Sequence, residues 1–137
     1  MRTMTRWMVA SLLMCGFNAY SAGTWAQEAE PKGPETVLAT FRVKADQLPA
    51  FLAMMPEYWK ALRAKELVNA DPYVLLVGEE EGKPVVYEIF SWKDHHAADN
   101  VPPEIQAYWD RMNAMVEKRG AHGGIEFPEV KLVSPVR

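Results

Sequence analysis

The sequence predicts an α+β fold, in which one four-stranded antiparallel sheet carries two helices on the same face. Two observations predict it. Four segments have the composition and alternation of strands, and two have the three-and-four spacing of amphipathic helices, in the order β-α-β-β-α-β. The chain of 137 residues has room for one hydrophobic core of ordinary domain size.

The first strand is predicted over residues 36–44. Val37, Ala39, Phe41 and Val43 fall on one face, and polar residues and Leu38 fall on the other. Apolar residues at every second position indicate a strand with one buried face.

A helix follows, for which Asp46 is a suitable N-cap. Pro49 is tolerated in its first turn, whereas Pro56 is expected to kink or split it. The turn-forming residues 69–72 are expected to end this region. The apolar stripe of the helix consists of Leu48, Phe51, Leu52, Met55, Trp59 and Leu62.

The middle of the chain predicts a β-hairpin. Residues 73–77 are almost wholly apolar, residues 79–84 are polar and contain Gly82, and residues 85–92 form the third predicted strand. Alternation places Val85, Tyr87 and Ile89 on one face of that strand and Val86, Glu88, Phe90 and Trp92 on the other.

The second helix is predicted to begin at Pro102-Pro103 and to end at Gly120. A final strand is predicted over residues 125–133, where Pro128 favours an edge position. The apolar stripe of this helix consists of Ile105, Tyr108, Trp109, Met112, Met115 and Val116.

This element order is the ferredoxin-like, or split βαβ, arrangement. Both helices cover one face of its sheet, so the apolar groups on the other face need another cover. A homodimer in which two sheets pair face to face is therefore predicted.

Residues 1–26 predict a secretory signal peptide. Arg2 and Arg6 precede an apolar run over residues 7–17, and Thr24-Trp-Ala26 offers small residues for cleavage after Ala26. Cleavage after Ser21, or acylation of Cys15, is the alternative. Residues 27–35 are expected to be a flexible spacer and residues 36–137 the folded domain. The expected location is periplasmic or secreted, with no stable membrane insertion after signal removal.

Composition excludes several classes of function. Without the leader, 13 basic residues face 18 acidic ones, a net charge of −5, which disfavours nucleic acid as a partner. The only cysteine is Cys15. After cleavage the domain therefore has no disulfide and no thiolate ligand or nucleophile.

The segment Val86-Tyr-Glu-Ile-Phe-Ser-Trp-Lys-Asp94 has an aromatic-acidic-apolar-aromatic pattern at the end of a third strand. With the element order, it makes residues 37–133 resemble the dimeric α/β-barrel superfamily, particularly the antibiotic-biosynthesis-monooxygenase-like proteins. The resemblance implies a dimer that holds a small hydrophobic or aromatic molecule between sheet and helices. Some relatives oxygenate such molecules without metal or flavin, and others degrade haem. The first strand contains Thr40 and no Asn, which disfavours haem degradation.

Candidate catalytic residues are His95, His96 and Asn100, in the loop that leads to the second helix. A neutral imidazole can act as a base near neutral pH, and an adjacent carboxylate can orient it. The alternative is that these are solvated loop residues.

Candidate ligand-binding residues are Trp92, Tyr87, Trp59 and Tyr108, whose rings can stack on an aromatic ligand. The alternative is that they only pack the core and the dimer. No cofactor and no metal are expected, because the possible ligands lack a recognised spacing. Those possible ligands are Asp94, His95, His96, Asp99 and His122.

The predicted function is therefore that of an exported protein that binds a small hydrophobic or aromatic molecule, in the manner of a cofactor-independent monooxygenase. The alternative is a non-catalytic binding or assembly module of the same fold. The sequence contains no phosphate-binding glycine loop and no nucleophile elbow.

Overall fold

The computed structural model describes residues 33–133. The predicted order of elements is confirmed, with two short 3-10 turns added before the helices. The elements are β1 (Glu35–Phe41), η1 (Ala45–Gln47), α1 (Leu48–Ala64), β2 (Val68–Glu80), β3 (Lys83–Trp92), η2 (Ala98–Asn100), α2 (Pro103–Met115) and β4 (Ile125–Glu126).

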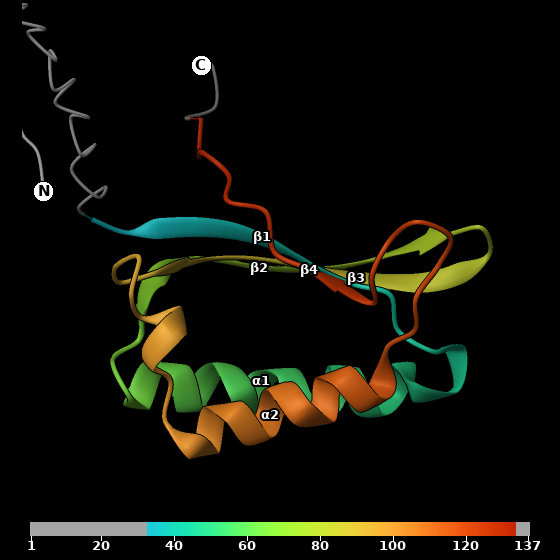
Figure 1. Cartoon of the computed structure of the whole chain (residues 1–137), viewed down its shortest axis with the longest axis horizontal. Helices are drawn as coiled ribbons and strands as arrows, with labels where there is room; N and C mark the ends of the chain where they lie inside the picture. Colours follow the sequence, from blue (N-terminus) through green and yellow to red (C-terminus); the bar gives the residue numbers. More distant parts are fainter. Residues whose placement is uncertain (1–32, 134–137) are drawn as a thin grey trace, which may run out of the picture.

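The strands form one sheet in the order β2-β3-β1-β4, and every neighbouring pair is antiparallel. Figure 1 shows α1 and α2 side by side beneath the same face of this sheet. The predicted α+β, ferredoxin-like fold is therefore confirmed.

The strands β2 and β3 form a long hairpin with a two-residue turn. Glu81 and Gly82 occupy the turn, with φ angles of 53° and 76°. Two successive positive φ angles are typical of a type I′ turn, whose twist matches that of the strands beside it. The hairpin predicted from the polar, glycine-containing link is confirmed.

The turn predicted after the first helix is wrong. Residues 69–72 do not end the region as a turn but belong to β2, where the pairing with β3 changes register between Val68 and Tyr73. A bulge of this kind absorbs Pro72, which has no N–H to donate to the neighbouring strand. Of the two effects expected of Pro56, a split does not occur, because α1 is one helix from Leu48 to Ala64. A kink at Pro56 stays a prediction.

The end of α2 and the last strand also differ from the prediction. The helix ends at Met115, because Val116 pairs with Val43 and the N–H of Glu117 donates to the carbonyl of Arg42. The last regular strand is only Ile125–Glu126. Beyond it, the N–H of Val130 still donates to the carbonyl of Thr36, so the segment continues irregularly along β1.

The core lies between the sheet and the two helices. The predicted alternation is confirmed, because the inward positions of β1 and β3 are buried. The main buried side chains are Val37, Ala39 and Phe41 of β1, Val86 and Phe90 of β3, Phe51, Met55 and Leu62 of α1, and Ile105 and Met112 of α2.

The C-terminal end of α1 contains a residue in the left-handed region, Glu66, with a φ angle of 56°. The N–H groups of Glu66 and Leu67 donate to the carbonyls of Arg63 and Leu62, which is the Schellman pattern that usually has glycine at this position. Glu66→Gly is expected to stabilise the fold by about 1 kcal/mol, because glycine adopts this conformation without the Cβ penalty. Urea unfolding measures it; Glu66→Ala, which keeps the Cβ, should show no such gain.

The predicted leader, residues 1–26, and residues 27–32 of the predicted spacer lie outside the described residues. Glu35, the last residue of the predicted spacer, is the first residue of β1. Among residues 33–133, no helix has the length and apolar character needed to cross a membrane.

Candidate functional site

A pocket of about 510 Å³ lies between the sheet and α2. Its volume is in the range that holds a small organic molecule. Residues of both helices, of β1, β3 and β4, and of the loop that precedes α2 contribute to its wall. The lining residues are Glu35, Val37, Tyr58, Trp92, Ala98, Asp99, Gln106, Trp109, Met112, Asn113, Ile125 and Phe127.

Three aromatic side chains form the most distinctive part of this wall. The indole N–H of Trp109 donates to the hydroxyl oxygen of Tyr58, at 2.9 Å. Trp92 meets Trp109 edge to face, with ring centroids 6.3 Å apart. These rings come from α2, α1 and the end of β3, so the wall depends on the packing of all three elements.

Burial raises the pKa of Tyr58 far above its usual value, and the charge of Glu88 raises it further. The phenol of Tyr58 is therefore protonated at any physiological pH. Since its oxygen already accepts a hydrogen bond from Trp109, its own O–H remains able to donate to a ligand or to a neighbouring acceptor.

Glu88, which does not line the pocket, lies on the face of β3 that is turned to the helices. It pairs across the sheet with Ala39 and Leu75, and its side chain is fully buried. Neither carboxyl oxygen has a hydrogen-bond partner within the described part of the chain. Burial raises the pKa of Glu88 to about 8. The carboxyl group is therefore mostly protonated at pH 7 and ionised in mildly alkaline solution.

Glu35 and Asp99 are the charged residues that line the pocket, and the partly exposed end at Glu35 is called its mouth below. Glu35, which lines the pocket, lies 3.7 Å from Nδ1 of His95, and both side chains are about one-fifth exposed. The exposed Glu129 joins them, and the donor atoms of all three lie within 4.8 Å of one another. Two carboxylates and one imidazole are suitable ligands for a divalent ion. Exposed acidic groups are also common without a bound ion. The expectation of no metal stays a prediction that elemental analysis of the purified protein can test.

The predicted catalytic residues are not all at the pocket. His95 lies beside Glu35 at the mouth, but His96 and Asn100 are exposed, and none of the three lines the pocket. The side-chain amide of Asn100 donates to the carbonyl of His96, at 2.9 Å. This bond holds the loop in shape. Their predicted catalytic role is untested.

Of the four predicted ligand-binding residues, Trp92 alone lines the pocket. Trp59 stacks on Tyr73, with centroids 4.0 Å apart, and Tyr108 packs on Tyr58 at 5.6 Å. Tyr87 is on the opposite face of the sheet, because its neighbours in β3 alternate with the inward residues. A binding role for these three stays a prediction that the pocket does not favour.

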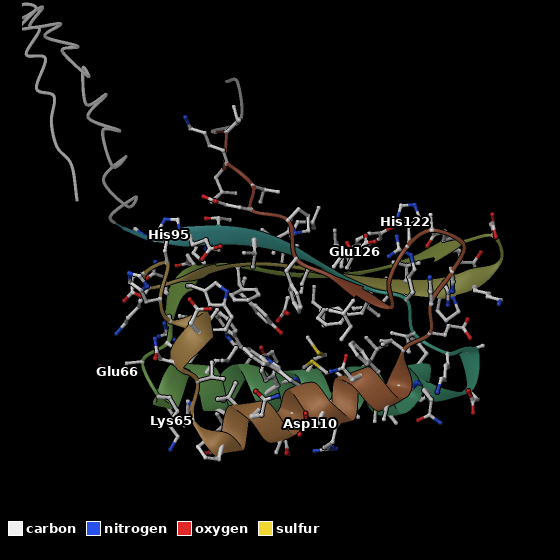
Figure 2. The ribbon with its side chains drawn as sticks, viewed as in Figure 1. Lys65, Glu66, His95, Asp110, His122 and Glu126 are labelled. Atoms are coloured by element: carbon white, nitrogen blue, oxygen red, sulfur yellow. The ribbon has the colours of Figure 1, made fainter. Side chains whose placement is uncertain are left out.

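The acidic and histidine residues considered as metal ligands are also separated. Figure 2 shows His95 at one end of the sheet and His122 near the other, beside Glu126. His122 lies 3.2 Å from that carboxylate. His95 and His122 therefore cannot ligate one ion.

Sequence reasoning did not select four residues that the structure makes important: Tyr58, Trp109, Glu88 and Glu35. A signal was available for Glu88, because strict alternation places its carboxyl between the apolar inward residues Val86 and Phe90. No local signal identifies the pairing of Tyr58 with Trp109, which depends on how two helices pack.

Comparison with known proteins supports the same fold. The structure resembles that of a Bacteroides thetaiotaomicron protein provisionally named an antibiotic biosynthesis monooxygenase, with a TM-score of 0.53 and 16% identity. The match covers 77% of this chain and 95% of that protein. No family model and no curated protein match the sequence.

The fold and the site thus define a class: a ferredoxin-like α+β domain with an aromatic pocket between sheet and helices. More narrowly, the chain has the fold of the antibiotic-biosynthesis-monooxygenase-like proteins, which confirms, for the fold, the resemblance inferred from the third strand.

Proposed function

We propose that the protein binds a small, planar, largely apolar molecule, of the polycyclic phenol or quinone kind, in the pocket beside α2. The observation that supports this most is the wall made by Trp92, Trp109 and Tyr58. Two indoles supply flat apolar surface for stacking, and the phenol supplies one fixed hydrogen-bonding group. Ligand sites commonly combine these features.

We propose further that the bound molecule is oxygenated without a resident cofactor. The name of the Bacteroides thetaiotaomicron protein supports this reaction class, although at 16% identity the likeness itself extends only to the fold. An electron-rich phenol in its ionised form can give electrons to oxygen directly, so the protein would need to bind and orient the molecule and to take up its proton.

The experiment is a titration of the purified domain with haem, quinones and polycyclic phenols, followed by tryptophan fluorescence. Trp92 and Trp109 lie in the pocket wall, so a ligand that stacks there should quench their emission. His95→Ala and His96→Ala are run alongside. If binding is saturable and His95→Ala weakens it, this result supports a site that extends to the mouth of the pocket. Product analysis under oxygen then tests catalysis. Absence of binding to the folded protein contradicts the proposal.

A non-catalytic binding or assembly module is the second candidate, and the outer face of the sheet favours it. Val74 and Leu76 of β2 point away from the helices and are 39% and 52% exposed. Ile89 and Tyr87 lie opposite them on β3. An apolar face of this kind supports the predicted homodimer, in which two sheets cover each other.

The dimer proposal has a direct test. Leu76→Glu is expected to weaken self-association at least about tenfold, because two carboxylates would enter the paired faces without partners. Sedimentation at micromolar concentration measures it. Lys83→Glu, an exposed change at the start of β3, is the matched control and should leave association unchanged. A wild-type monomer under these conditions would contradict the proposal.

Export to the periplasm or medium is proposed from the predicted leader over residues 1–26 alone. N-terminal sequencing of the protein recovered from outside the cytoplasm tests this proposal. A start at Gln27 is expected, and a start at Met1 would contradict it.

A further inference from the structure

The charged part of the pocket wall is acidic. Among the lining residues, Glu35 and Asp99 carry charge, and none is a lysine or an arginine. The exposed Glu129 adds a third carboxylate at the mouth, since its donor atom lies within 4.8 Å of those of Glu35 and His95. A cleft lined by charge of one sign concentrates ligands of the opposite sign. The mouth therefore attracts cations and repels anions.

The lysines and arginines of the protein do not neutralise these carboxylates. Within residues 33–133, no lysine or arginine forms an ion pair with any of the three. Lys93 follows the lining residue Trp92, but it pairs with Glu66 at 3.9 Å. Arg111 of α2 lies over the ring of Tyr108, 5.7 Å from its centroid. The positive charge that would balance the mouth is therefore left for a ligand to supply.

Glu35 can act together with an aromatic ring. It is the direct cross-strand partner of Trp92 in the pairing of β1 with β3. Residues paired in this way project from the same face of a sheet, with Cβ atoms about 5 Å apart, and both of these line the pocket. A cation is attracted by the face of an indole as well as by a carboxylate. The pair thus offers two kinds of contact to one positively charged group.

Asp99 reaches the same pocket from a different element. It lies in η2, next to Ala98, which also lines the pocket, and its side chain is exposed. Water and salt screen an exposed charge more strongly than a partly buried one. Asp99 is therefore expected to attract a cation less than Glu35, whose side chain is only 21% exposed.

We propose that the ligand of this pocket carries a cationic group, a protonated amine, and that this group lies at the mouth beside Glu35 and Trp92. The planar body of the ligand stacks further in, against Trp109 and Tyr58, and Asp99 adds attraction from the loop before α2. Glu35 is then the residue that selects for an amine and against a carboxylate.

This inference rests on the proposed function, because it assumes a planar aromatic ligand between the sheet and α2. It narrows the ligand class to phenols or quinones that carry a basic nitrogen. A carboxylated ligand is disfavoured, because it would bring another negative charge close to Glu35 without a counter-ion.

The test uses three anthraquinones that share one ring system and differ in a single substituent: an aminomethyl, a hydroxymethyl or a carboxylate group. Near neutral pH these are positive, neutral and negative. Each is titrated into the purified protein at about pH 7.5 and followed by tryptophan fluorescence. At this pH most imidazoles are neutral, and EDTA keeps metal ions from the carboxylates. The titrations are repeated at about 20 mM and about 500 mM salt, since salt screens exposed charges.

The variants are Glu35→Gln and Asp99→Asn, each of which removes one charge with little change in shape. Glu57→Gln is the matched control. Glu57 is an exposed carboxylate of α1, next to Tyr58 along the chain, and it does not line the pocket. Affinity for the neutral alcohol reports on the pocket itself, because it does not depend on these charges.

In the wild type at low salt, the amine should bind about tenfold more tightly than the alcohol, and the carboxylate about tenfold more weakly. Glu35→Gln should reduce the spread between amine and carboxylate from about a hundredfold to about tenfold. It should leave affinity for the alcohol within about threefold of the wild type. Asp99→Asn should reduce the spread by a smaller factor, high salt should narrow it, and the control should match the wild type.

The outcomes separate the two proposals. If the three ligands bind equally, or the carboxylate binds most tightly, the cationic ligand is wrong and the binding proposal stands. If Glu35→Gln and Asp99→Asn keep the full preference for the amine, the place assigned to the cation is wrong. If none of the three binds to the folded wild-type protein, the proposed quinone binding fails and this inference fails with it. If Glu35→Gln does not fold, Asp99→Asn and the salt dependence decide the question.

Discussion

Replacing Glu88 by Gln is expected to remove most of the loss of stability that the wild-type protein shows as the pH rises. The carboxyl group has a pKa of about 8 in the folded state, whereas its ordinary value is 4.5. Between these values the folded state keeps a proton that the unfolded state has released. The free energy of unfolding therefore falls as the pH rises through this window, and levels off above pH 8.

The size of the effect follows from the difference in pKa. Each unit corresponds to about 1.4 kcal/mol, so the loss across the window is on the order of 4 kcal/mol. Glu88→Gln, which cannot ionise, should match the wild type near pH 5 and exceed it by most of this amount near pH 9. Urea unfolding at both pH values measures the difference. Glu79→Gln, on the exposed part of β2, should follow the wild-type curve.

A wild-type protein that is as stable at pH 9 as at pH 5 would show that Glu88 finds a partner when it ionises. Equal slopes for the wild type and Glu88→Gln would place the pH dependence elsewhere.

Blocking the pocket with Asn113→Trp is expected to abolish ligand binding and leave the fold intact. Asn113 lines the pocket from α2 but is exposed, so a large ring at this position can lie across the opening without entering the core. Affinity for a polycyclic phenol should fall about a hundredfold or more, because the ring would occupy space that the ligand needs. Titration followed by tryptophan fluorescence measures it.

Ala114→Trp is the matched control for this change. Ala114 is the next residue of α2, is exposed, and does not line the pocket. The same substitution one position along the helix should leave affinity within about threefold of the wild type. Unaltered binding in Asn113→Trp would show that the ligand site lies elsewhere, with the outer face of the sheet as the next candidate.

The fold could be predicted because its signals are local. Alternation of Val37, Ala39 and Phe41 identified the buried face of β1, and the polar link containing Gly82 identified the hairpin. The errors arose where tertiary pairing overrode local preference. Residues 69–72 have turn chemistry, yet β3 holds them in a bulged strand. Met115 ends α2 because the next residues pair with the chain after β1, which nothing in the helix itself indicates.

The candidate site is harder to predict from the sequence than the fold, because its residues meet only after folding. Trp92 was selected, since it belongs to the pattern at the end of the third strand. Tyr58 and Trp109 belong to separate helices, and their hydrogen bond depends on the angle at which these helices pack. Glu35 and His95 meet because β1 lies beside the end of β3. A periodic pattern indicates which residues face inward, but not which of them meet.

Because the segment after β4 is irregular, one side of the pocket wall is expected to open more easily than the other. Ile125 and Phe127 form its side at the sheet edge, where regular pairing with β1 lasts for only two residues. The opposite side is held by two helices and a central strand. Free energies of local opening follow the number of buried contacts and backbone hydrogen bonds that must break. Residues 127–133 should therefore exchange their amide hydrogens well before β1 and β3 do, and a ligand could enter at this edge while the aromatic wall keeps its shape.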